Sequence, residues 1–185
     1  MLSLIICLPI LTALALMALP NATSRTARDG ALISMILTLA GASYVFFNAP
    51  DMNMGYAFEC QRDWLPTLGI SYHVGVDRLN AMLILLSALV GTAAVGVSTP
   101  PKENAKHYYA MGLIMVGGMA GAFASLDLFF LYIFHEFALI PTFILIGIWG
   151  GRATIASGHE NHALPRVGKP HPAVGIARTG LGGRR

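Results

Sequence analysis

Four long runs of apolar residues dominate the sequence and limit what it can fold into. A helix rises about 1.5 Å per residue, so about 20 apolar residues cross a hydrocarbon core of about 30 Å. All four runs are long enough for such a crossing. Charged residues make up only 11% of the 185 residues, whereas soluble domains carry about 25%. The chain is therefore predicted to lie in a lipid bilayer.

The four runs divide into five predicted helices. Pro20 ends the first run, which has no basic residue before it, so we expect a retained anchor helix and not a signal peptide. The fourth run is too long for one crossing, and residues 125–127 can turn the chain and cap a new helix. The expected fold is all-α, a polytopic transmembrane protein with five spans, at about residues 1–19, 31–47, 79–97, 108–125 and 128–149.

The positions of the cations predict the orientation of these helices. Short loops rich in Lys and Arg tend to stay on the cytoplasmic side of a membrane. When the chain crosses the membrane at each predicted helix, most acids between the helices fall on one side. Arg62 and Arg78 are the two cations on that same side. The N-terminus is therefore expected outside and residue 150 inside. The cations on the opposite, inner side are Arg25, Arg28, Lys102, Lys106 and Arg152.

Two segments outside the helices have their own character. The loop over about 50–76 is too long for a turn, and short alternating apolar residues over 64–75 predict a small hairpin on the outer face. Residues 152–185 are rich in Gly, Pro and basic residues and are expected to be disordered, as a tail after a membrane domain over 1–151.

No metal, disulfide or nucleotide site is indicated. The tail histidines do not have the spacing of a closed zinc site. The two cysteines stand alone, and no GxGxxG or Walker pattern occurs. Half of the twelve Lys and Arg residues lie after position 150, so the charge of +3 does not indicate nucleic-acid binding. The histidines and cysteines concerned are His159, His162, His171, Cys7 and Cys60.

Glu136 is the strongest candidate for a functional residue. It is the carboxylate deepest inside a predicted span, where a charged residue costs about 2.5 to 3.5 kcal/mol on insertion scales. The neighbours on its helical face are Tyr132, Ile133, Leu139 and Ile140, which offer no counter-charge. Glu136 must therefore be protonated, hydrated or paired with another helix or chain. We expect a proton-transfer role, and a neutral Glu that only makes a hydrogen bond between helices is the structural alternative.

Two neighbours are possible auxiliaries of Glu136. His135 is adjacent in sequence, but adjacent helical residues point about 100° apart, so packing and a relay role both stay open. Pro141 removes a backbone donor and is expected to kink the helix, which can admit water near the carboxylate or only shape the packing.

Three further residues are expected to be structural. Asp77 stands at the start of a helix, where an acid stabilises the positive end of the dipole. Gly117 and Gly121, with Gly118 between them, form a small-residue face that lets a neighbouring helix approach closely.

Two stretches carry a resemblance to a known family. They are WLPTLGISYHVGVDRL, over 64–79, and FFLYIFHEFALIPTFILIGIWGGR, over 129–152. In both, the sequence resembles the antiporter-like membrane subunits of proton-translocating NADH:quinone oxidoreductase, respiratory complex I. Within that family it is most similar to the N-terminal part of subunit M, the counterpart of mitochondrial chain 4.

The resemblance implies a proton-translocating role in a membrane arm that couples quinone reduction to proton transport. Glu136 matches the fifth-helix glutamate that the family pairs with a later lysine. No cofactor is implied in this chain, because NADH, FMN, iron-sulfur clusters and quinone belong to partner subunits. Other membrane-arm subunits and the lipid bilayer are the implied partners. The sequence departs from the family at His135, at Arg78 and in lacking the later helices.

Two alternative functions and one genetic hypothesis stay open. The chain could be a subunit of an Mrp-type cation/proton antiporter, or a membrane assembly scaffold without a proton role. The abrupt loss of apolar periodicity near residue 157 also suggests premature termination, with a tail read out of frame. DNA that encodes no further apolar spans in either other frame would contradict this hypothesis.

Overall fold

The computed structural model describes residues 1–19, 23–50, 55–65, 67, 69–99, 101 and 104–150. All of the described residues belong to one compact unit, Met1–Gly150. The tail expected over 152–185, with its histidines, lies outside the described residues.

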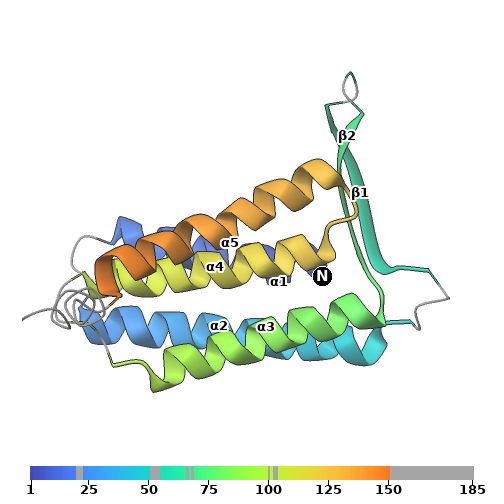
Figure 1. Cartoon of the computed structure of the whole chain (residues 1–185). Helices are drawn as coiled ribbons and strands as arrows, with labels where there is room; N and C mark the ends of the chain where they lie inside the picture. The colour runs from blue at the N-terminus through green and yellow to red at the C-terminus, as the bar shows by residue number, and fades with distance from the viewer. Residues whose placement is uncertain are drawn as a thin grey trace, which may run out of the picture. The chain divides into compact units, whose positions relative to one another are not determined.

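Five helices and one β-hairpin make up the described part of the chain (Figure 1). The predicted count of five helices is confirmed. In chain order the elements are α1 (Leu2–Ala18), α2 (Ser24–Asn48), β1 (Ala57–Leu65), β2 (Ile70–Val76), α3 (Arg78–Val97), α4 (Ala105–Ala124) and α5 (Leu128–Trp149).

The largest difference from the predicted helices is at the start of α2. The helix begins at Ser24 and not near residue 31. The polar residues in between indicated a loop, but the Arg28 guanidinium donates to the carbonyl of Gly96 at 2.7 Å, near the end of α3. The charged first turns of α2 therefore stay helical because they have a partner on the neighbouring helix.

Helix α4 lies at the centre of the described helices. It packs against α1, α2, α3 and α5, while α2 and α3 pair along their lengths (Figure 1). Ten residues of α4 are buried, most of them Ala or Gly or medium-sized apolar residues. Small side chains at these positions let four neighbours approach one helix.

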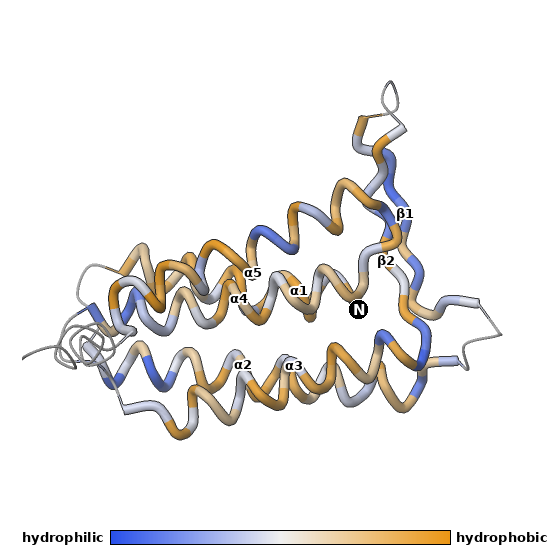
Figure 2. The backbone as a smooth tube through the Cα atoms, viewed as in Figure 1, coloured by the Kyte–Doolittle hydropathy of each residue, from blue (hydrophilic) through white to orange (hydrophobic). Residues whose placement is uncertain are grey.

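Three of the described helices are long and apolar enough to cross a membrane, namely α2, α3 and α5. Helix α1 is apolar but has only 17 residues, and α4 is not among the three. The position of α4 explains its composition, because a helix covered by other helices needs fewer large apolar side chains than one that faces lipid. Figure 2 shows apolar residues along all five helices.

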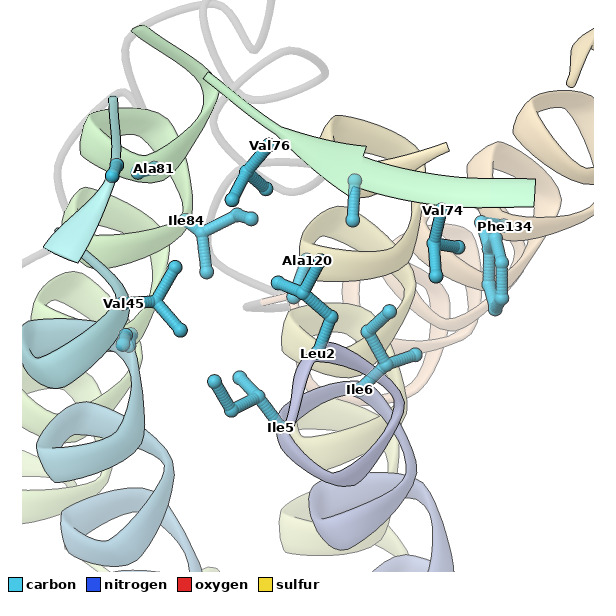
Figure 3. Close-up of a cluster of buried hydrophobic side chains, with 14 of the residues drawn as sticks. Leu2, Ile5, Ile6, Val45, Val74, Val76, Ala81, Ile84, Ala120 and Phe134 are labelled. Atoms are coloured by element: carbon cyan, nitrogen blue, oxygen red, sulfur yellow. The ribbon is translucent and has the colours of Figure 1, made fainter. Parts of the chain in front are cut away.

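The hairpin predicted over 64–75 is confirmed, and it begins earlier, at Ala57. Strands β1 and β2 are antiparallel, with Cys60 opposite Val74 and Arg62 opposite Tyr72. Val74 and Val76 of β2 are fully buried, and Figure 3 shows them within a cluster of apolar side chains from the helices. The hairpin is therefore part of the core at one end of the bundle.

Candidate functional site

Glu136 lies well inside α5. At about 1.5 Å per residue it stands about 12 Å from the first residue of a helix about 33 Å long. Figure 2 shows a hydrophilic interruption of the apolar α5, and the sequence there is His135 and Glu136. The structure therefore places the carboxylate at the depth of the apolar interior if α5 crosses a bilayer.

The carboxylate of Glu136 is partly exposed and has no hydrogen bond or ion pair with any of the described residues. An unpaired carboxylate in hydrocarbon is unfavourable when ionised. Glu136 is therefore protonated, or its partner is water or a group outside the described residues.

Helix α5 packs against the bundle along one narrow face. Phe130, Phe134 and Pro141 are its buried residues, and His135 is exposed. Only 17% of its most apolar stretch is buried, against 33% for α2 and for α3. The rest of the helix is free to contact lipid or another protein.

Pro141 lies inside α5, which continues from Leu128 to Trp149. A proline has no N–H, so the carbonyl of Phe137 loses its usual helical donor. The hydroxyl of Thr142 donates to the carbonyl of Ala138 at 2.7 Å and lies 3.2 Å from the Met115 sulfur of α4. Pro141 therefore interrupts the hydrogen-bond ladder of α5 less than two turns beyond Glu136, on the buried side of the helix.

Two aspartates cap helices at the hairpin end of the bundle. Asp77 accepts a hydrogen bond from the amide of Asn80 at 2.7 Å and caps α3. Asp127 accepts from the amides of Phe129 and Phe130 at 2.8 and 3.3 Å and caps α5. Asp127 also accepts from the amide of Ser71 in β2 at 3.4 Å, a link that no local sequence signal indicated.

The glycines of α4 meet two different helices. A Cβ at Gly117 would lie 2.6 Å from the Ile10 side chain of α1. A Cβ at Gly118 would lie 2.8 Å from backbone atoms of α5, and one at Gly121 would overlap the ring of Phe134. The small-residue face therefore serves α1 at one position and α5 at the others.

Polar contacts also gather on the hairpin. The His73 ring and the Glu59 carboxylate are 2.6 Å apart across the two strands. The Tyr72 hydroxyl donates to Ser3 Oγ at 3.0 Å, and burial raises the pKa of Tyr72 although this hydrogen bond opposes the shift. Sequence reasoning missed these contacts, since the residues of each pair are 14 or 69 positions apart.

The described residues hold no group of three His, Cys, Asp or Glu side chains that could bind a metal ion. A groove of about 270 Å³ lies between the ends of α4 and α5, with His107 and Trp149 among its lining residues. Glu136 does not line this groove. Within the described chain, the chemistry available near the middle of α5 is therefore that of the Glu136 carboxyl group and the adjacent His135 imidazole.

Comparisons with known proteins identify relatives of this chain. No family model matches it. The chloroplastic NAD(P)H-quinone oxidoreductase chain 4 of Chara vulgaris is 38% identical over 152 residues, which are 82% of this chain and 31% of that protein. The NADH-quinone oxidoreductase subunit M of Rickettsia conorii is 32% identical over 126 residues, 68% of this chain and 26% of that protein.

The fold agrees with these sequence matches. A chain in the structure of respiratory complex I from Thermus thermophilus with bound NADH is similar with a TM-score of 0.70 and 28% identity. The match covers 85% of this chain and 31% of that chain. The chain is a homologue of chain 4 and subunit M. The resemblance expected from the two sequence stretches is thus confirmed.

The homology covers part of each chain 4 or subunit M protein. The chain spans about three tenths of the length of these relatives, and the match fits their N-terminal part. A homologue of a membrane subunit of complex I with apolar helices is an integral membrane protein.

Proposed function

We propose that the chain forms part of the membrane arm of a NAD(P)H- or NADH-quinone oxidoreductase and takes part in moving protons across the membrane. The names of its homologues support the place in such an oxidoreductase. One observation carries the proton role: Glu136 lies inside the apolar α5 and its carboxyl group has no partner among the described residues.

The proton role follows from the energetics of a carboxyl group in hydrocarbon. Desolvation favours the neutral, protonated form, whereas a nearby cation or water favours the carboxylate. A change in the surroundings of Glu136 therefore changes its proton occupancy. Alternating between the two surroundings, with access to opposite sides of the membrane, moves protons.

The rest of α5 supports this role in two ways. Pro141 removes a backbone donor from α5 five residues after Glu136, and such an interruption lets a helix bend and admit water near the carboxyl group. His135 is exposed on the same helix, and its imidazole serves as a second carrier of protons. Both are auxiliaries in this proposal, and Glu136 carries the proton.

The redox chemistry belongs to partner subunits. NADH, FMN, iron-sulfur clusters and quinone bind there, and quinone reduction drives the membrane arm. Contacts of this chain are with other membrane-arm subunits and with lipid. All five helices cross a bacterial inner membrane in this proposal, with the N-terminus outside.

The test is Glu136→Gln in membrane vesicles that hold the assembled oxidoreductase with this chain. Gln keeps the size of the side chain but cannot take up and release a proton. NADH-driven acidification of the vesicle interior should therefore be lost while the complex still assembles. Glu59→Gln is the matched control, because Glu59 is on the hairpin and paired with His73. This control should pump normally.

Two other outcomes identify the alternative functions. Normal NADH-driven pumping by Glu136→Gln would contradict the proposal and favour an assembly scaffold. Proton exchange driven by a Na⁺ or K⁺ gradient, with no response to NADH, would favour an Mrp-type antiporter subunit.

A further inference from the structure

The first turn of α5 is joined to the hairpin through one side chain. Asp127 uses Oδ1 to accept the amides of Phe129 and Phe130, and Oδ2 to accept the amide of Ser71 in β2. Asp77 caps α3 with a bond to Asn80, within its own helix. Asp127 therefore combines two tasks, the helix cap and a bond to a hairpin strand.

The segment before α5 is also attached to β2 by its backbone. The amide of Leu126 donates to the carbonyl of His73 at 2.9 Å, and Ser125 forms a β-bridge with Val74. The hydroxyl of Ser125 donates to the carbonyl of Asp127 at 2.9 Å. The link between α4 and α5 is therefore tied to β2 by an isolated β-bridge and one further backbone hydrogen bond.

A row of aromatic rings continues this connection along α5. The rings of Trp64 and Tyr72, both on the hairpin, each lie 5.3 Å from the ring of Phe130. Phe130 lies 6.3 Å from Phe134, which comes two residues before Glu136. Phe130 and Phe134 are buried, with 5% and 8% of their surface exposed. The row thus reaches the turn of α5 that carries the carboxylate.

The hairpin can act as a fixed reference because β2 is anchored in the bundle. Val74 and Val76 are fully buried in a cluster with side chains from all five helices (Figure 3). The Tyr72 hydroxyl is bound to Ser3 of α1. Helix α5, in contrast, packs mainly on α4 and buries little of its surface. Its second point of attachment is the hairpin.

We propose that Asp127 and Phe130 are positioning residues, through which the hairpin sets the height and rotation of α5 and thereby the place where the Glu136 carboxyl meets its proton donor and acceptor. This inference rests on the proposed proton role of Glu136. Proton transfer needs hydrogen-bond distance, and a displacement of 1 Å in such a site can cost about 100-fold in rate.

The deciding variant is Asp127→Asn in the assembled complex. Asn caps a helix about as well as Asp, so α5 keeps its N-cap. It has one carbonyl oxygen where Asp has two, so the acceptor for the Ser71 amide is lost. Asp77→Asn makes the same chemical change at the cap of α3, where the bond to Asn80 stays within the helix. Phe130→Leu removes the aromatic contacts, and Phe130→Tyr keeps them.

The measurements are the ratio of protons moved to NADH oxidised, its pH profile and the amount of assembled complex. Asp127→Asn and Phe130→Leu should lower the ratio, because a displaced Glu136 carboxyl group misses its proton donor or acceptor in part of the turnovers, and should shift the pH profile. Asp77→Asn and Phe130→Tyr should keep both at the wild-type values. If the complex with Asp127→Asn does not assemble, the comparison of Phe130→Leu with Phe130→Tyr tests the positioning role.

The possible failures are distinguishable. If Glu136→Gln abolishes pumping while Asp127→Asn and Phe130→Leu leave the ratio and the pH profile unchanged, the positioning role is wrong and the proposed function stands. If Glu136→Gln pumps normally, the proposed function is wrong and the positioning role falls with it.

Discussion

Gly118 of α4 packs directly against the backbone of α5. An added Cβ would lie 2.8 Å from Ala138 N, Phe134 O and Phe137 C. Backbone atoms cannot move aside as the end of a flexible side chain can, so the two helices would have to separate. A Cβ added at Gly112, on the same helix, would meet open space, so this position offers a control.

Gly118→Ala should lower the free energy of unfolding by about 1 to 3 kcal/mol, the usual cost of overpacking. Gly112→Ala should raise it by up to about 1 kcal/mol, because Ala is the better helix former. The midpoint of thermal unfolding in detergent measures both changes. Equal midpoints for the two variants would contradict the close contact of α4 and α5.

Tyr72 gives a prediction about pH. Burial raises the pKa of its phenol above the ordinary 10.0, although the bond to Ser3 opposes the shift. The stability contributed by the neutral phenol is therefore complete below about pH 10 and is lost as the pH rises through the raised pKa.

Tyr72→Phe keeps the ring but removes the hydroxyl bonded to Ser3. Stability at pH 7 should fall by about 1 kcal/mol, and the loss of stability above pH 10 should become smaller. Unfolding midpoints from pH 7 to pH 11 measure this, with the exposed Tyr56→Phe as the control. If Tyr72→Phe loses as much stability above pH 10 as the wild type does, another group causes that loss.

At the scale of elements, α2 and α3 are joined across their ends by a charged side chain. Arg28 of α2 donates to the Gly96 carbonyl of α3 at 2.7 Å, where the negative end of the α3 dipole favours a cation. Arg28→Met should therefore cost about 1.5 to 3 kcal/mol, the range for a hydrogen bond from a charged group. Unfolding in detergent measures the cost.

Arg25 provides the comparison for Arg28. It lies on the same helix, three residues earlier in the sequence. Arg25→Met should change stability by less than about 0.5 kcal/mol, as surface substitutions usually do. An equal effect of the two variants would mean that general charge loss, and not the bond to α3, is responsible.

At the scale of the whole molecule, five crossings and three crossings predict different topologies. With five crossings, residues on the hairpin and at the start of α5 lie outside, and the residues between α3 and α4 lie inside. Helix α4 is not among the three helices that are long and apolar enough to span a membrane. The topology experiment therefore has to show whether α4 crosses.

Single cysteines at Gln61, Thr99 and Leu128 test the topology, after Cys7 and Cys60 are replaced by Ser. All three positions are exposed. A membrane-impermeant maleimide on intact cells should label positions 61 and 128, and should label position 99 only after permeabilisation. Labelling of position 128 only after permeabilisation would show that α4 does not cross.

The hairpin and the first turn of α5 show the limits of sequence reasoning. The aspartate caps are local signals, so the starts of α3 and α5 could be predicted to within one residue. Asp127 was visible as a cap, but its bond to Ser71 joins residues 56 positions apart. Nothing in the local sequence around either residue encodes such a pairing, and the same holds for Arg28 and Gly96.

The sequence by itself determined the five helices, the hairpin and the place of Glu136 well inside α5, because apolar run length and helix-ending residues act over a few turns of chain. The tertiary structure decided which helix each glycine of α4 meets, why α4 can be less apolar, and how the hairpin is fastened to α5. These features depend on segments distant in sequence coming together, and packing of side chains in three dimensions selects them.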